Sequence, residues 1–262
     1  MASTLFYERP VILNRERHKH TRLAPAVNHF AFAARTNALP IATTEFGEAA
    51  RHYPIVFVGE EGGPFGVAAL VGLTRDENLL VDAQGRWATG TYVPAFARRY
   101  PFVLARGVQG QPEDQLTVCV DEVYPGLSAD GQGGGEALFD AGGQETPYLQ
   151  RVLEFLSAFE QDIQRTRAFT QRLEELGLLA PKTITVERRG AKQTLEGVWI
   201  VDEVKLRALD DARVVGLFRA NYLPWIEAHL LSLGNLQQLA ARLDVREALS
   251  EAAAAPAETA QT

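Results

Sequence analysis

Residues 147–177 carry an apolar pattern with the spacing of an α-helix, and this pattern constrains the fold more than any other feature of the sequence. Thr146 and Pro147 are typical of a helix start, because threonine caps the first turn and proline lacks an amide hydrogen that the first turn would leave unpaired. Gly177 is typical of a helix end. The pattern predicts one helix of about 30 residues, or two helices with a bend near Thr166. The apolar positions are Leu149, Val152, Leu153, Leu156, Phe159, Ile163, Phe169, Leu173 and Leu176.

Apolar runs separated by turn residues predict two β-hairpins in the N-terminal half. Residues 54–59 and 65–73 flank the segment EEGGP, and residues 78–82 and 86–93 flank AQG. Each pair has the strand pattern and the turn residues of a hairpin. The glycine-rich segment does not match G-x-G-x-x-G and joins two strands rather than opening a helix, so we do not expect it to bind a phosphate.

Two further N-terminal segments indicate short helices. The segment TTEFGEAARHYP predicts a helix with Thr43 or Thr44 as its cap, and Pro54 returns the chain to an extended form. Residues 92–105 predict a helical turn followed by a strand.

The C-terminal part is expected to contain one hairpin and several helices. Residues 183–202 predict a hairpin that turns at Arg189 and Gly190, and two or three helices are expected around 203–219 and 222–243. The predicted fold class is therefore α+β, with a strand-rich N-terminal half, a long amphipathic helix, and a C-terminal hairpin plus helices.

Local composition divides the chain into three parts. Residues 1–40 have little periodicity and are interrupted by prolines, which predicts an extended basic arm that lies over the fold. Residues 41–249 are expected to form a single α+β domain, with a candidate internal boundary in the glycine-rich stretch 130–145. Residues 250–262 lack an apolar face and are expected to be disordered.

The charge of the chain limits its partners. The 26 basic and 33 acidic residues give a net charge of −7, which argues against nucleic-acid binding because no cations are in surplus to replace phosphate counterions. Residues 1–40 contain six basic and two acidic side chains, a net charge of +4, which leaves −11 for the rest. The arm is thus suited to an acidic surface, either of this protein or of a partner.

Cysteine content and hydropathy indicate a cytoplasmic protein. Cys119 is the only cysteine, which excludes an intrachain disulfide and a cysteine-rich metal site and favours a reducing compartment. The N-terminus has no apolar core of the kind that a secretory signal needs, and no apolar stretch approaches the roughly 20 residues of a membrane helix. We expect no membrane span and no cofactor.

The letters VDEV occur twice, at 120–123 and 201–204, each time after an apolar run. Asp202 is placed to cap a helix, with Glu203 in its first turn, and Asp121 precedes a turn. Neighbouring side chains on a strand point to opposite faces, so paired carboxylates there do not easily share a substrate. Both motifs are expected to mark strand ends, and a role of the two aspartates in a reaction is only a candidate.

Two groups of residues are candidate binding sites. His18 and His20 are two residues apart, and on an extended chain this spacing allows both imidazoles to bind one metal ion. No nearby motif supplies a third ligand. The alternative is that both histidines belong to a solvated basic arm. Arg98, Arg99 and Tyr100 are candidates for contact with a ligand or partner, because guanidinium groups among aromatic rings suit a carboxylate or an acidic protein. Packing in the core is the alternative for this second group.

The segments that carry a family resemblance are LNRERHKHTRL (13–23), NALPIATTEFGEAARHYPIVF (37–57), NLLVDAQGRW (78–87), YVPAFARRYPF (92–102), FLSAFEQDIQRTRAFTQRLEELGLL (155–179) and GVWIVDEVKLRAL (197–209). Together they resemble the SapC family of bacterial proteins, named for an association with surface-layer systems, over nearly the whole chain. The family supplies no catalytic residues to transfer to this sequence, so none is assigned.

The resemblance implies a non-enzymatic cytoplasmic accessory or binding protein linked to surface-layer or envelope-protein biogenesis or export, with a protein of that system as its partner. Family genes often lie near TonB-dependent receptors, flavin-dependent halogenases and cupin-like proteins. That context implies the alternative, a peptide- or amino-acid-modifying enzyme, or a partner of one, in TonB-receptor-associated ligand handling. A sensor of a small ligand is a third hypothesis. Homo-oligomerisation stays open, because the amphipathic helix can bury its face internally or against a second copy.

Overall fold

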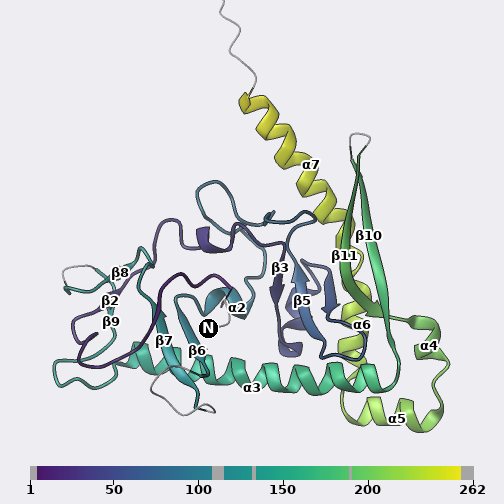
Figure 1. Ribbon diagram of the computed structural model, residues 1–262, viewed down its shortest axis with the longest axis horizontal. Helices are drawn as coiled ribbons and strands as arrows, with labels where there is room; N and C mark the ends of the chain where they lie inside the picture. The colour runs from purple at the N-terminus through teal and green to yellow at the C-terminus, as the bar shows by residue number, and fades with distance from the viewer. Residues whose placement is uncertain (1–4, 108–114, 132–133, 189–190, 255–262) are drawn as a thin grey trace, which may run out of the picture.

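The computed structural model describes residues 5–107, 115–131, 134–188 and 191–254 (Figure 1). The strands are β1 (Pro10–Ile12), β2 (Arg22–Leu23), β3 (Ala38–Pro40), β4 (Ile55–Val58), β5 (Gly66–Leu70), β6 (Phe102–Ala105), β7 (Thr117–Asp121), β8 (Leu127–Ser128), β9 (Glu136–Ala137), β10 (Leu179–Arg188) and β11 (Ala191–Val201). The helices are α1 (Phe46–Ala49), α2 (Ala95–Arg98), α3 (Pro147–Glu175), α4 (Glu203–Arg207), α5 (Asp211–Arg219), α6 (Leu223–Ser232) and α7 (Asn235–Ala254), with 3₁₀ turns η1 (Ala31–Ala33) and η2 (Thr43–Glu45).

The strands form antiparallel sheets. The largest sheet has the order β10-β11-β4-β5-β3, and two smaller ones have the orders β1-β7-β6 and β8-β2-β9. The mixture of helices and antiparallel sheets confirms the predicted α+β class. Residues 1–40, expected to form an extended arm, supply β1, β2 and β3, which is one strand to each sheet.

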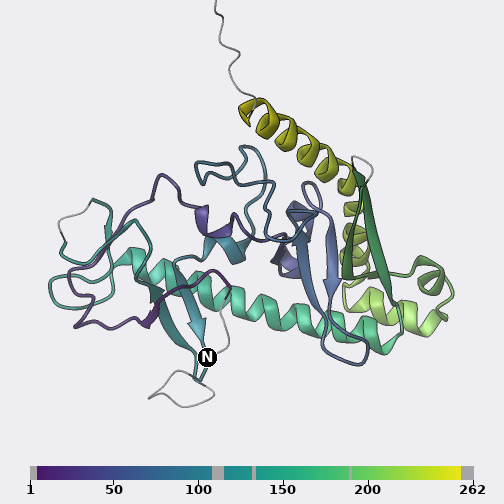
Figure 2. The same ribbon diagram turned by 45° about the horizontal axis from the view of Figure 1, so that its top comes forward.

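The long amphipathic helix forms as α3, a single helix that runs along one side of the molecule (Figures 1 and 2). Its start is the predicted one, because Thr146 Oγ1 accepts a hydrogen bond from Leu149 N at 3.3 Å and Pro147 occupies the first turn. The helix continues through Thr166, whose hydroxyl accepts a hydrogen bond from Thr43 N at 2.9 Å. The one-helix prediction is confirmed, and the alternative of two helices is wrong.

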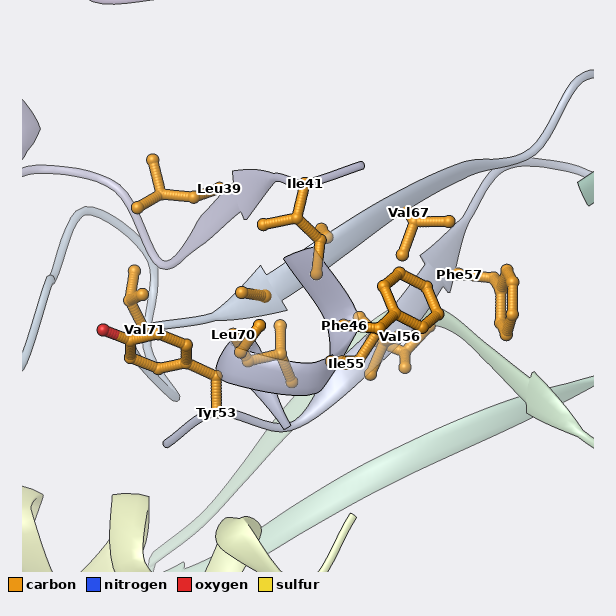
Figure 3. Close-up of a cluster of buried hydrophobic side chains, with 14 of the residues drawn as sticks. Leu39, Ile41, Phe46, Tyr53, Ile55, Val56, Phe57, Val67, Leu70 and Val71 are labelled. Atoms are coloured by element: carbon orange, nitrogen blue, oxygen red, sulfur yellow. The ribbon is translucent and has the colours of Figure 1, made fainter. Parts of the chain in front are cut away.

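Two hydrophobic clusters pack against α3, one towards each end. The β7 cluster consists of Leu23, Tyr100, Phe102, Val120, Tyr124, Leu138, Phe139, Leu149 and Leu156. The larger β5 cluster surrounds β4 and β5 and receives Phe169 and Leu173 from α3. Figure 3 shows part of the β5 cluster, where the labelled side chains are Leu39, Ile41, Phe46, Tyr53, Ile55, Val56, Phe57, Val67, Leu70 and Val71. The helix therefore belongs to both cores.

The helix expected near residue 43 forms as η2 followed by α1, but neither threonine caps it. Glu45 takes this role, because its buried carboxylate accepts hydrogen bonds from Ala42 N at 2.8 Å and from Ala95 N at 2.7 Å. Thr43 and Thr44 instead form hydrogen bonds with α3. A single carboxylate thus satisfies backbone donors of two elements and joins η2 to α2.

The two N-terminal hairpin predictions have different outcomes. The first forms as β4 and β5, and residues 92–105 form α2 and β6 as predicted. The hairpin predicted within residues 78–93 is wrong, since only an isolated bridge joins Val81 and Trp87. Asp82 accepts two backbone N–H bonds from the following turn, both at 2.9 Å, and such local bonds compete with a strand ladder.

The C-terminal hairpin forms as β10 and β11, and its predicted turn at Arg189 and Gly190 lies outside the described residues. Within the described part, four helices follow rather than two or three, because a second capping aspartate starts a new helix at α5. The last helix, α7, extends through Ala254. The first residues of the segment 250–262, expected to be disordered, are thus helical, and residues 255–262 lie outside the described part.

His229 on α6 connects this helix to the large sheet. The ring is fully buried, its Nδ1 lies 2.8 Å from Ile55 O on β4, and its Nε2 accepts a hydrogen bond from Val201 N on β11 at 3.1 Å. This arrangement requires a neutral ring with the hydrogen on Nδ1. Burial lowers the pKa of His229 to about 4.

Protonation of His229 should therefore destabilise the fold in mild acid. Its contribution is complete above pH 6.5 and is lost as the pH falls towards 4, because the unfolded chain takes up a proton that the native ring excludes. The loss amounts to up to about 3 kcal/mol of unfolding free energy. Urea unfolding followed by circular dichroism across this range should show a smaller pH dependence in His229→Gln than in the wild type. Equal pH dependence in the two proteins would contradict this role.

Removal of the Phe169 side chain should open a cavity where α3 meets the β5 cluster. The residue is fully buried, and its ring contacts the rings of Phe46, Phe57, Tyr222 and Trp225. We expect Phe169→Ala to lower the unfolding free energy by about 3–5 kcal/mol. The exposed neighbour Ala168 provides the control, and Ala168→Ser should change stability by less than about 0.5 kcal/mol. Urea titration measures both values, and similar effects would show that α3 is not anchored here.

Candidate functional site

Asp121 at the end of β7 is a buried anchor rather than a surface acid. Its carboxylate accepts hydrogen bonds from Glu8 N at 3.0 Å, from Arg9 N at 2.9 Å and from Tyr100 Oη at 3.3 Å. The side chain has no exposed surface. Asp121 therefore attaches the N-terminal segment to β7 and to Tyr100, which lies between α2 and β6.

The second VDEV motif has a different structural role. Asp202 Oδ1 accepts hydrogen bonds from Val204 N at 3.0 Å and from Lys205 N at 3.2 Å, which makes it the N-cap of α4. Glu203 follows in the first turn of that helix. The predicted cap is confirmed, and both motifs do mark strand ends.

Aromatic rings from distant parts of the chain gather around Tyr100. Its ring stacks on that of Phe32, with centroids 4.0 Å apart and an interplanar angle of 28°. The ring of Tyr124 stands edge-on to Tyr100 at 5.6 Å and 84°, and the ring of Tyr7 lies at 5.4 Å. Stacked and edge-on rings at these distances are mutually stabilising, so the group forms a fixed aromatic wall.

This wall borders a pocket of about 280 Å³, which we call the aromatic pocket. Its lining includes Glu8, Asn28, His29, Phe32, Tyr100 and Tyr124. Four segments supply these residues: the N-terminal segment held by Asp121, the chain around η1, the link between α2 and β6, and the turn after β7. The pocket thus exists only when these segments have come together.

Hydrogen bonds fix the orientation of His29 in the pocket. Its Nδ1 lies 2.7 Å from Tyr124 Oη, which also accepts a hydrogen bond from Ala26 N at 3.0 Å and donates one to Ala24 O at 3.2 Å. The single hydroxyl hydrogen of Tyr124 is directed to Ala24 O. The hydrogen in the shorter bond between Tyr124 and His29 therefore belongs to His29 Nδ1, and His29 Nε2 keeps its lone pair. No described residue bonds to this Nε2. Burial lowers the pKa of His29, so the ring is neutral at pH 7.

The charges beside the pocket are unequal. Glu122, just outside it, is neutralised by Arg17 at 2.5 Å and by Arg9 at 3.4 Å. Glu8 lines the pocket, and its carboxylate has no ion pair among the residues that the structure describes. The pocket therefore keeps a negative charge at its wall.

The three residues predicted to contact a partner do not share one surface. Arg98 is exposed and donates from Nε to Val93 O at 3.0 Å. Arg99 is partly buried with its Cζ 3.9 Å from the centroid of the Phe96 ring, and burial lowers its pKa. Tyr100 is 6% exposed and lines the aromatic pocket. Packing in the core describes Tyr100 and, in part, Arg99, and contact of the three residues with a partner stays a prediction.

His18 and His20 have separate environments. His18 is buried, with Nδ1 3.0 Å from both the backbone N and O of Asn14, and burial lowers its pKa. Its Nε2 lies 3.8 Å from Glu122 and has no hydrogen bond in the described part of the chain, while His20 is exposed. Over the described residues, no three His, Cys, Asp or Glu side chains are grouped as metal ligands. The histidine pair thus has no additional ligand there.

Other hollows of about 300, 630 and 910 Å³ lie elsewhere on the described part of the chain, and polar groups in the two largest already hold the fold together. One of about 630 Å³ lies between the β4–β5 turn and α3, where the Thr170 hydroxyl donates to Phe65 O. The other, of about 910 Å³, lies beside α7, where Arg246 donates to two backbone carbonyls. The aromatic pocket differs from both because packed aromatic rings form its wall beside Glu8 and His29 Nε2.

Sequence reasoning named Tyr100 but missed Glu8, His29 and Tyr124. Each of the three looked like an ordinary arm or turn residue, and the four positions are scattered over more than a hundred residues. The pairing of β1 with β7 and the bonds of Asp121 bring Glu8 to the site, and the bond to Tyr124 brings His29 there. No local pattern in the sequence carries this information.

The architecture defines an antiparallel α+β protein whose clearest site is a pocket of side-chain size. The chain belongs to the SapC family, whose family model matches residues 13–239, and this confirms the resemblance seen in the sequence. No match was found among curated proteins or among solved structures. In the described part of the chain, none of the helices combines the length and apolar character needed to cross a membrane.

The two VDEV aspartates should differ in their contribution to stability. Asp121→Ala leaves four buried or half-buried donors without their acceptor, so we expect a loss of about 3 kcal/mol. Asp202→Ala removes a helix cap and should cost about 1 kcal/mol. Urea unfolding of both variants under the same conditions measures the difference. An equal loss would mean that the Asp121 bonds add nothing beyond an ordinary cap.

Proposed function

We propose that this SapC-family protein is a non-enzymatic cytoplasmic accessory protein that binds a protein partner in surface-layer or envelope-protein biogenesis or export. The observation that carries the binding role is the aromatic pocket, with unengaged polar groups beside ordered rings. The link to surface layers rests on membership of the family. Binding energy at protein interfaces concentrates on a few side chains that fill such pockets.

The size of the pocket favours a side chain over a cofactor. Its volume of about 280 Å³ lies below the range of roughly 300–1,000 Å³ that is usual for small-molecule sites. Its walls are held before any ligand arrives, because Tyr124 bonds to the backbone at Ala24 and Ala26 and Tyr100 bonds to Asp121. A site ordered in advance costs little entropy when a partner binds.

The predicted contact residues have distinct roles in this proposal. Tyr100 forms part of the pocket wall, and Arg98 is an exposed contact outside its lining. Arg99 supports both from within, because its guanidinium lies between the rings of α2 and α3, with Phe159 at 5.5 Å.

A pair of matched substitutions tests the proposal. Val123 lines the pocket, and Val123→Trp should fill it, whereas Val27 is 90% exposed outside the pocket lining and Val27→Trp is the control. Affinity capture from native lysate with mass spectrometry should enrich one surface-layer, envelope or export protein with the wild type and with the control. We expect Val123→Trp to reduce that enrichment at least tenfold.

Circular dichroism melting curves should show that both variants are folded. Full retention of the partner by folded Val123→Trp would exclude the pocket as its contact. Turnover of a peptide or amino acid that depends on one side chain would instead support the enzymatic alternative.

A further inference from the structure

The charge in the lining of the aromatic pocket has one sign. Glu8 supplies a carboxylate, and His29 supplies a neutral ring with the lone pair of Nε2 directed away from its bond to Tyr124. Among the residues that the structure describes, no lysine or arginine belongs to the lining. The pocket therefore offers hydrogen-bond acceptors and a negative charge, and the side chain of Asn28 adds a neutral amide rather than the cation that would attract an anion.

The ring faces add to this preference. Phe32 and Tyr100 are stacked, and Tyr124 stands nearly perpendicular to Tyr100, so the rings form a corner rather than a flat surface. The face of an aromatic ring attracts a cation placed within about 6 Å of its centre. A corner of this kind surrounds the alkyl chain of a ligand and still leaves its charged end near a carboxylate.

A second carboxylate lies directly behind the wall. Asp121 is fully buried, and its hydrogen-bond partners are neutral donors: the backbone N–H groups of Glu8, Arg9 and Val123, and Tyr100 Oη. Burial raises the pKa of Tyr100, and the negative charges of Asp121 and Glu8 raise it further. The hydroxyl at the pocket wall thus lies in a negative electrostatic potential.

The nearby cations are engaged elsewhere. Arg9 and Arg17 pair with Glu122, and the guanidinium of Arg99 packs on Phe96. None of the three lines the pocket.

We propose that the aromatic pocket binds the cationic end of a lysine side chain of the partner, with the alkyl chain against Phe32, Tyr100 and Tyr124 and the ammonium group between Glu8 and His29 Nε2. This assignment rests on the proposed binding role and adds the chemical class of the ligand. The ammonium group matches each wall: it donates to the carboxylate and to the imidazole and is attracted by the rings. An acidic or uncharged side chain would leave Glu8 without a partner.

The test uses the full-length protein and two small probes, Nα-acetyl-lysine N-methylamide and its norleucine counterpart, which lacks the ammonium group. Their affinities are measured by NMR titration of the ¹⁵N-labelled protein, following amides next to the pocket such as that of Ala26. We expect the lysine probe to bind at least tenfold more tightly than the norleucine probe. Its affinity should also fall as the salt concentration rises.

Glu8→Gln is the informative variant, because Glu8 is exposed and its loss should not affect folding. We expect it to weaken the lysine probe three- to tenfold and to leave the norleucine probe unchanged. Glu16→Gln, an exposed acid outside the pocket lining, should alter neither affinity. Equal affinities for the two probes, no binding by the folded wild type, or unchanged lysine binding in Glu8→Gln would each overturn the assignment.

The outcomes separate this assignment from the proposed function. If the probes do not discriminate but Val123→Trp still loses its partner, the pocket is the contact and the lysine assignment fails. If the lysine probe binds as expected and Val123→Trp retains its partner, the pocket takes a cation, and the partner binds at another surface.

Discussion

The shared use of α3 by two hydrophobic clusters is the constraint on which the rest of the structure depends. A helix of 29 residues is a rigid rod about 44 Å long, and it buries Leu149 and Leu156 in the β7 cluster and Phe169 and Leu173 in the β5 cluster. Because each end of the helix is fixed in a core, the smaller sheet with β6 and β7 cannot move freely relative to the large sheet. The aromatic pocket lies on the side of the β7 cluster, whose members Tyr100 and Tyr124 also form its walls.

Attachment of the N-terminal segment completes the pocket. β1 contributes only a short ladder to β7, so the carboxylate of Asp121 adds the bonds that hold residues 8 and 9 in place. This arrangement carries Glu8 to the pocket and leaves Glu122 to neutralise Arg9 and Arg17. The basic character of the first 40 residues is thereby partly cancelled within the protein, whereas the negative charge at the pocket persists. Asp121 therefore both anchors the N-terminal segment and places Glu8, the source of the negative charge, at the pocket.

Membership of the SapC family and the geometry of the pocket contribute different parts of the functional argument. The family match covers residues 13–239 and assigns no reaction or site, so the link to surface layers belongs to the proposal. The pocket supplies a binding site of about 280 Å³, which is lined by ordered rings, the neutral imidazole of His29 and Glu8. The carboxylate of Glu8 has no ion pair within the described part of the chain. A protein that holds one cationic side chain of a partner is consistent with both. It also gives the acidic charge of the chain a role in recognition.

Features that depend on neighbouring residues could be predicted from the sequence: α3 with its Thr146 cap, the β4–β5 and β10–β11 hairpins, the Asp202 cap, the α+β class and the family. It predicted a cap at Thr43 or Thr44 and a hairpin near Trp87, both wrong, because Glu45 and Asp82 satisfy backbone groups through bonds that no strand or helix pattern reports. Long-range contacts place Tyr100 in a pocket with Glu8, His29 and Tyr124, which no local pattern predicts. The same contacts direct the guanidinium of Arg99 inward and bury Asp121 of the first VDEV motif. The physical reason is that periodicity and capping act within a few residues, whereas the pocket arises where strands far apart in the chain pair and bury a shared carboxylate.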